Sequence, residues 1–266
     1  MDDSQTEQPW PTEAVILMAG IGSRLGATGG ALAKPLVSVG ERPLISYTFD
    51  ALGNAGICTV HAVMGANSDR LIEQIEPLLP RGMELNAIIN HAWRKQNGVS
   101  VLAAADHVKR PFFLLMGDHL FESSILDALR PFAAAPLALA VDRKINSIFD
   151  LDDAMKVRTD GEQIVAIGKD LEDYDAIDTG VFLCSAEIFS YLRRAQRDGD
   201  CSLADGVRLM ASEGKASVID IGDAWWQDVD TPEMLARAEQ ELARLLRQSG
   251  RGLAQESISG ERSAHT

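Results

Sequence analysis

The sequence predicts an α/β fold in which helices cover both faces of a doubly wound, mainly parallel sheet, with a small antiparallel β insertion. Two observations lead to this prediction. Between residues 14 and 141, short apolar runs alternate with segments whose apolar residues recur at helical spacing, a pattern typical of βαβ units. After Asp142, apolar positions alternate on either side of Asp160-Gly161, which is a strong hairpin signal.

The first half of the chain is expected to supply the parallel part of the sheet. It opens at 14–18 with five apolar residues, a run short enough for a buried parallel strand. The segment at 43–53 shows the helical pattern, with Leu44, Ile45 and Phe49 on one face. By the same criteria we expect strands at 14–18, 58–64, 85–89, 111–116 and 137–141, and helices at 43–53, 67–79, 99–109 and 124–129.

The second half is expected to complete the sheet and to end in a helix. Thr231 is suited to cap that helix, and Pro232 to its first position, where an N–H is not needed. Before it, the sequence indicates a hairpin over 155–167, strands at 177–184 and 216–221, and helices at 186–197 and 202–212. We therefore predict one domain at 14–247, a flexible N-terminal extension over 1–13 and a disordered tail over 248–266.

Composition restricts the partners of this 266-residue chain. Its formal charge is −14, whereas binding to a nucleic-acid backbone needs a basic surface, so we expect no nucleic-acid partner. A nucleotide substrate needs only a local basic pocket. The three cysteines lack metal-ligand or disulfide spacing, and no apolar run reaches the roughly 20 residues that span a bilayer. We expect a cytoplasmic protein without a membrane segment, and an acidic α/β enzyme of this size often forms a homodimer.

A glycine-rich loop between the first strand and Lys34-Pro35 is the leading candidate for a phosphate site. Glycines let the backbone approach a ligand closely, and free amides can cradle phosphate oxygens. Arg24 and Lys34 add positive charge to the loop. The alternative is an ordinary strand-to-helix turn. A turn with this much glycine and two cations is more often a phosphate site.

Two familiar phosphate loops do not match this stretch. A dinucleotide fingerprint needs G-x-G-x-x-G, but Gly20, Gly22 and Gly26 are spaced G-x-G-x-x-x-G. A P-loop needs G-K-[ST] at the start of a helix, whereas Lys34 precedes Pro35, which has no amide hydrogen. A third pattern, G-x-G-x-R-L followed by K-P-L, fits residues 20–25 and 34–36.

Two aspartates are candidates for a metal site. Asp118 follows the strand expected at 111–116, and ligands of parallel sheets collect at the carboxyl ends of strands. Mg²⁺ usually takes one or two carboxylates plus substrate phosphates, and Asp228 is the second candidate. Asp230 has a simpler explanation, because a negative charge before the last helix favours its dipole. A cap or an ion pair is the alternative for Asp118, and His119 is expected to have a supporting or structural role.

Together these segments resemble the nucleotidyltransferase superfamily that makes nucleoside-diphosphate sugars and alcohols. The resemblance covers residues 14–239. Its motifs occur in family order: G-x-G-x-R-L with K-P-L, G-D at 117–118, D-T-G at 178–180 and W-x-D at 226–228. The segments at 97–100, 116–119, 167–171 and 228–231 look most like inositol-1-phosphate cytidylyltransferases. The resemblance implies a Rossmann-like fold and transfer of CMP from CTP to a phosphorylated alcohol such as inositol 1-phosphate, with release of pyrophosphate.

The resemblance also implies roles for individual residues. It implies Mg²⁺ on Asp118 and Asp228, and it makes Arg24 and Lys34 the catalytic cations on the triphosphate. Substrate contacts are implied for Ala19, Gly20, Gly22 and Ser23 in the loop, for Asn97, Gly98 and Ser100 at the base and ribose, and for Lys169, Asp178 and Thr179 at the acceptor. The sequence departs from the family at Ala33, where proline is usual, after a longer insert at 27–32.

The resemblance leaves rival functions open. A sugar-1-phosphate nucleotidyltransferase that uses UTP, dTTP or GTP differs only in base and acceptor contacts, and phosphocholine cytidylyltransferases share several of these motifs. Some family members are regulatory subunits that bind nucleotides without turnover, but retention of Arg24, Lys34, Asp118 and Asp228 argues against that reading. Many relatives carry this domain fused to a membrane-embedded phosphatidyltransferase, and here we expect a stand-alone enzyme.

Overall fold

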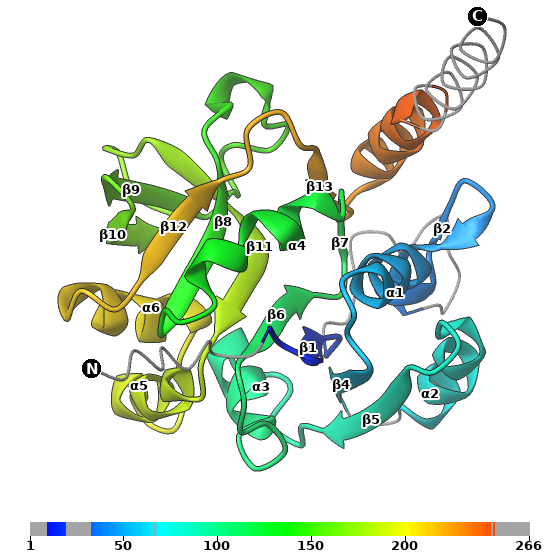
Figure 1. Cartoon of the computed structure of the whole chain (residues 1–266), viewed down its shortest axis with the longest axis horizontal. Helices are drawn as coiled ribbons and strands as arrows, with labels where there is room; N and C mark the ends of the chain where they lie inside the picture. Colours follow the sequence, from blue (N-terminus) through cyan, green and yellow to red (C-terminus); the bar gives the residue numbers. More distant parts are fainter. Residues whose placement is uncertain (1–9, 20–32, 66–67, 246, 248–266) are drawn as a thin grey trace, which may run out of the picture.

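The computed structural model describes residues 10–19, 33–65, 68–245 and 247, which build one large sheet with helices packed against it (Figure 1). The order of its nine strands is β5-β4-β1-β6-β11-β8-β12-β10-β9. Strands β10 and β11 run in one direction and the other seven in the opposite one. The strands are β1 (Glu13–Leu17), β4 (Thr59–Met64), β5 (Glu84–Ile89), β6 (Phe112–Met116), β8 (Leu137–Asp142), β9 (Lys156–Asp160), β10 (Gln163–Gly168), β11 (Ala176–Cys184) and β12 (Ser217–Asp220). Seven of these nine described strands share a direction, but four of their pairings are parallel and five are antiparallel, so the sheet is mixed: β5-β4-β1-β6 form the predicted parallel part, and β11 separates it from β8.

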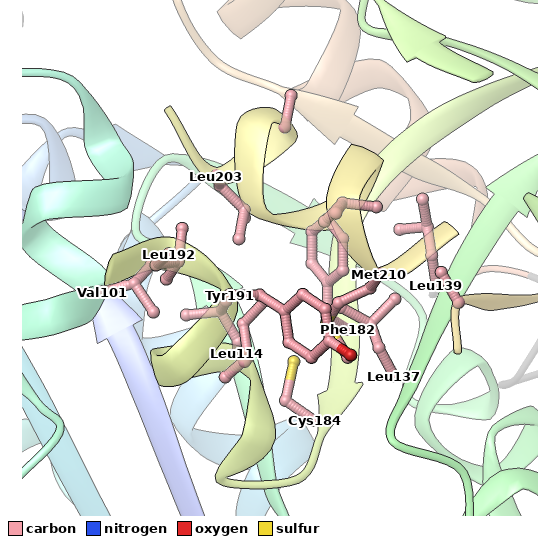
Figure 2. Packing of buried hydrophobic residues seen from close by; sticks show 14 of the residues in the cluster. Val101, Leu114, Leu137, Leu139, Phe182, Cys184, Tyr191, Leu192, Leu203 and Met210 are labelled. Carbon is pink, nitrogen blue, oxygen red and sulfur yellow. The ribbon is translucent and has the colours of Figure 1, made fainter. Parts of the chain in front are cut away.

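Each face of the sheet has its own apolar core, which confirms the doubly wound arrangement. Residues of β6 alternate between the two cores: Leu114 packs on one side, and Phe113 and Leu115 pack on the other, as the period of two in a strand requires. Figure 2 shows the first core, where Leu114, Leu137 and Leu139 of the sheet meet Val101, Leu192 and Met210 of the helices. The helices on this side are α3 (Asn97–Ala103), α5 (Glu187–Ala195) and α6 (Leu203–Ser212), and on the other side α1 (Leu44–Asn54), α2 (Asp69–Ile75) and α4 (Ser124–Ala128).

The antiparallel insertion is the hairpin β9–β10, as the sequence indicates. Its turn includes Gly161, whose φ of 58° is a conformation that glycine adopts without steric cost. The hairpin joins the main sheet, because β10 pairs with β12 and β9 pairs with the start of β11. It therefore extends the sheet next to the strand that carries Asp178.

Two short pairs of strands are not foreseen by the sequence patterns. They are β2 (Ser38–Val39) with β3 (Arg42–Pro43), and β7 (His119–Phe121) with β13 (Trp226–Asp228). Strands of two or three residues are too short to show an alternating pattern. The pair β7–β13 positions candidate site residues, because it brings the chain after Asp118 alongside the chain before the last helix.

The last helix begins as predicted and covers residues 232–245 of the described chain. Thr231 caps it, since its hydroxyl accepts a hydrogen bond of 3.2 Å from the backbone N–H of Met234. Leu235 and Ala238 pack in a third small core with Val229 and Leu120. Figure 1 shows this helix in orange, leading away from the body beside β13.

Residues 10–13 correct the predicted N-terminal extension. Glu13 belongs to β1, and the Trp10 indole donates a hydrogen bond of 2.9 Å to the carbonyl of Ala55. The Trp10 ring also contacts Phe113 edge-on, with 5.3 Å between ring centroids. An extension that reaches residue 13 is therefore too long, because Trp10 packs against Phe113 and Glu13 pairs within the sheet. Within the described residues no helix is long and apolar enough to cross a membrane.

Candidate functional site

A cleft of about 540 Å³ lies where β6 and β11 separate. Its lining includes Asp118 after β6, Asp178 of β11 and Asp228 of β13. These residues are far apart in the sequence, and the topology brings them together because β7 and β13 pair directly beyond β6. The position agrees with the rule that ligands of α/β sheets bind beyond the carboxyl ends of strands.

Lys34 lies between two acids at one side of this cleft. Its Nζ is 3.0 Å from Oδ2 of Asp118 and forms a second ion pair with Asp230. Burial lowers the pKa of Lys34, but the charges of Asp118 and Asp230 outweigh it and the pKa is raised overall. Burial likewise raises the pKa of Asp118, yet His119 and Lys34 hold that pKa below its usual value. Both partners are therefore charged at neutral pH.

Asp228 adds a further carboxylate next to this cluster. It faces His119 across the β7–β13 ladder, and Val229 donates a hydrogen bond of 2.9 Å to the carbonyl of Asp118. Burial raises the pKa of Asp228, and the charges of Asp230 and Asp118 raise it further. Such mutual repulsion is relieved by a cation placed between the acids.

The acidic cluster fits a divalent cation only together with a substrate. Within the described residues, no three His, Cys, Asp or Glu side chains are grouped as a metal site. Asp118 and Asp228 alone leave most positions of an octahedral ion unfilled, and phosphate oxygens and water usually fill them for Mg²⁺. The pair therefore suits an ion that arrives with a nucleotide.

The role of Asp230 in this cluster was missed by the sequence reading, which assigned it to the helix dipole. Asp228 and Asp230 are two residues apart at the end of a strand, and side chains at this spacing point to the same side. This spacing is the sequence signal that could have placed Asp230 beside Asp228. The dipole explanation is incomplete, since Asp230 also pairs with Lys34.

On the acceptor side predicted from the resemblance, Asp178 and Lys169 line the cleft and Thr179 does not. The Asp178 carboxylate accepts a hydrogen bond of 2.7 Å from the N–H of Gly180, and burial raises its pKa to about 6. Lys169 forms an ion pair with Asp153, which also lines the cleft. The Thr179 side chain is fully buried, and its hydroxyl donates to the carbonyl of Ala140 at 2.8 Å. The expected contact of Thr179 with acceptor hydroxyls does not fit this placement.

Asn97, Gly98 and Ser100 lie in the first turn of α3, where Asn97 and Gly98 contact the start of α6. The side-chain Oδ1 of Asn97 accepts a hydrogen bond of 2.8 Å from the backbone N–H of Leu203, and Asn97 also lines the cleft. A Cβ on Gly98 would lie 2.7 Å from the carbonyl oxygen of Cys201, so only glycine fits. Ser100 is buried and accepts from the Asn90 amide at 3.0 Å. Their contact with base and ribose stays a prediction.

The predicted phosphate loop falls largely outside the described residues. Ala19, half-buried at its start, is described. Gly20, Gly22, Ser23 and Arg24 lie in the part of the chain that the structure does not describe. Lys34, at the other end of the loop, is brought next to Asp118.

Residues 14–205, most of the chain, match the model of the MobA-like NTP transferase domain. The chain belongs to this family. It is 32% identical over 237 residues to a Thermococcus kodakarensis protein named bifunctional IPC transferase and DIPP synthase, covering 88% of this chain and 51% of that protein. An Archaeoglobus fulgidus protein of the same name is 30% identical, covering 93% of this chain and 47% of the relative. The chain thus spans about half the length of these relatives.

Among solved structures, the chain is similar to the inositol-1-phosphate CTP transferase from T. maritima. The two share 26% identity with a TM-score of 0.78, and the match covers 87% of this chain and 98% of that one. The structure of a putative glucose-1-phosphate thymidylyltransferase from Bacillus anthracis matches with a TM-score of 0.76 at 18% identity, which supports the fold alone. The Rossmann-like α/β fold and the nucleotidyltransferase class expected from the sequence are confirmed.

Proposed function

We propose that this protein transfers CMP from CTP to a phosphorylated alcohol, with inositol 1-phosphate as the acceptor, and releases pyrophosphate. The observation that carries the proposal is the ion pair of Lys34 with Asp118 beside a cleft that is lined by Asp118, Asp228, Asp178 and Lys169. The similarity to the T. maritima enzyme, which spans nearly all of that chain, supports the choice of CTP and inositol 1-phosphate.

In this proposal, the protein's own residues contribute position and charge. An acceptor phosphate oxygen attacks the α-phosphorus of CTP, the bond to the β-phosphate oxygen breaks, and pyrophosphate leaves. Lys34 neutralises charge that develops on the α-phosphate, and Lys169 holds the acceptor phosphate. Reactions of this kind depend on alignment and electrostatics, with little covalent work for the protein.

Mg²⁺ is the metal that we propose for this site. Asp118 and Asp228 would hold it, and when bound it would neutralise the negative charge that two acids and a triphosphate bring together. The chemistry of the donors fits such an ion, because Asp118 and Asp228 both line the cleft, and burial first and then the charges of Asp230 and Asp118 raise the pKa of Asp228. We further propose that the protein is cytoplasmic and that it forms a homodimer. Sedimentation of the purified chain would test the dimer.

Pyrophosphate release over a matrix of nucleotides and acceptors tests the function. CTP, UTP, dTTP and GTP are each combined with inositol 1-phosphate, glucose 1-phosphate and phosphocholine, with and without Mg²⁺. We expect turnover with CTP and inositol 1-phosphate, loss of turnover when EDTA removes the metal, and CDP-inositol as the product. Turnover with a sugar phosphate and another nucleotide would reassign the substrate, and binding of CTP without pyrophosphate release would contradict the enzyme assignment.

A further inference from the structure

His119 occupies a place in the cleft that the proposed chemistry does not use. It follows Asp118 directly, it lies opposite Asp228 in the β7–β13 ladder, and its side chain is 17% exposed. Its Nε2 is 3.6 Å from Oδ1 of Asp118. On the other side of the ring, Nδ1 is 2.9 Å from the carbonyl oxygen of Thr179. Because a carbonyl can only accept, Nδ1 carries the hydrogen in this contact.

The backbone of β11 is shaped to receive this ring. Pairing of β11 with β8 shifts register between Asp178 and Phe182, and pairing with β6 starts only at Val181. Gly180 has a φ of 75°, and a Cβ there would lie 2.5 Å from Cε1 of the His119 ring. A side chain at this position is therefore excluded by both backbone strain and the imidazole.

The irregular stretch of β11 also holds the Asp178 side chain in place. The Asp178 carboxylate accepts the N–H of Gly180, and the Thr179 hydroxyl bonds to Ala140 on the neighbouring β8. The Thr179 carbonyl is left for His119, whose ring reaches across the opening between β6 and β11. One imidazole thus connects the chain that carries Asp118 to the segment that carries Asp178.

We infer that His119 is a positioning residue that sets the acceptor side of the cleft, at Asp178, against the metal side, at Asp118 and Asp228. The inference rests on the proposed function. Its physical basis is that transfer needs the attacking oxygen in line with the phosphorus, and a misplacement of about 1 Å can cost on the order of 100-fold in rate. The anchor is the hydrogen bond from His119 Nδ1–H to the Thr179 carbonyl. A substituted side chain that places a donor at the same point should therefore restore the activity.

Three substitutions and one control separate this role from a merely structural one. Asn places an amide N–H near the former Nδ1, Gln places one near the former Nε2, and Ala supplies neither. For His119→Ala and His119→Gln we expect kcat to fall about 10- to 100-fold and the KM for the acceptor to rise, with the KM for CTP changed less than about threefold. His119→Asn should recover most of the loss. His91→Asn, on an exposed residue away from the cleft, should match the wild type.

Wild-type values in a folded His119→Ala protein would overturn the inference while the proposed function stands. Equal losses for Asn, Gln and Ala, or a parallel rise in the KM for CTP, would also overturn it. If the wild type turns over no nucleotide with any acceptor, the proposed function fails instead. In that case ¹⁵N shifts of the His119 ring in the intact protein still test the anchor: a proton held on Nδ1 supports it, and an Nδ1 without a proton overturns it.

Discussion

At the scale of single residues, Lys34 and Asp118 form the contact on which the proposed reaction depends most. Replacing Asp118 by Asn or Lys34 by Ala removes one preorganised charge, which typically costs on the order of 10²–10³ in rate. We expect kcat for pyrophosphate release to fall by at least that factor in each variant, with the circular dichroism spectrum unchanged. Arg42→Ala is the matched control, because Arg42 and Asp50 form an ion pair that is about half exposed. Near-normal turnover in either cleft variant would remove these residues from the mechanism.

Asp178 has a role in the proposed function, but its ionised form makes the folded protein less stable. Its pKa of about 6 in the folded protein lies above the unfolded value of about 3.9. The stability that its proton contributes is thus complete below pH ~4 and lost as the pH rises through 6. At pH 8, Asp178→Asn should raise the melting temperature by about 2–4 °C and weaken acceptor turnover, and the thermal gain should vanish near pH 4. Asp106→Asn, at an exposed position, is the control. A lower melting temperature at pH 8 would contradict this prediction.

At the scale of elements, predictability from sequence follows the length of each pattern. Apolar runs such as β6 and β8 and the Thr231-Pro232 start of the last helix are set by local chemistry, and the structure has them where expected. The pair β7–β13 has no such signature, because three-residue strands form only when the surrounding fold brings them together. The inward orientation of Thr179 follows from the irregularity at Gly180, which no local sequence pattern predicts.

The contact between α3 and α6 gives a test of one element against another. A methyl group on Gly98 would lie 2.7 Å from backbone atoms of Cys201 and Ser202, so α3 must shift away from the start of α6. Gly98→Ala should lower the free energy of unfolding by about 1–3 kcal/mol, the usual cost of overpacking. Gly168→Ala meets its nearest neighbour at 3.7 Å and serves as the control. Urea denaturation of both variants measures the difference, and equal stability would show that the two helices adjust freely.

At the scale of the whole molecule, the sheet carries a buried ionisable cluster at His61, away from the cleft. His61 of β4 is 5% exposed, its Nε2 is 3.5 Å from the Glu13 carboxylate, and its Nδ1 lies 2.9 Å from the Asn86 amide. Burial lowers the pKa of His61, although the nearby Glu13 charge partly offsets the effect. Protonation of this histidine is therefore less favourable in the folded than in the unfolded chain.

Protonation of His61 makes the stability of the fold depend on pH. Below the unfolded pKa of about 6.5 the unfolded chain binds a proton that the folded chain resists, so stability falls as the pH drops from 7 toward 5. His61→Phe keeps a ring of similar size and removes the titration, and its melting temperature should gain on the wild type as the pH falls through this range. Thermal melts at half-unit pH steps measure the difference, with His91→Asn as the exposed control. Parallel curves for wild type and His61→Phe would show that the acid sensitivity of the fold originates elsewhere, and a steeper fall in the variant would reverse the sign assigned to His61.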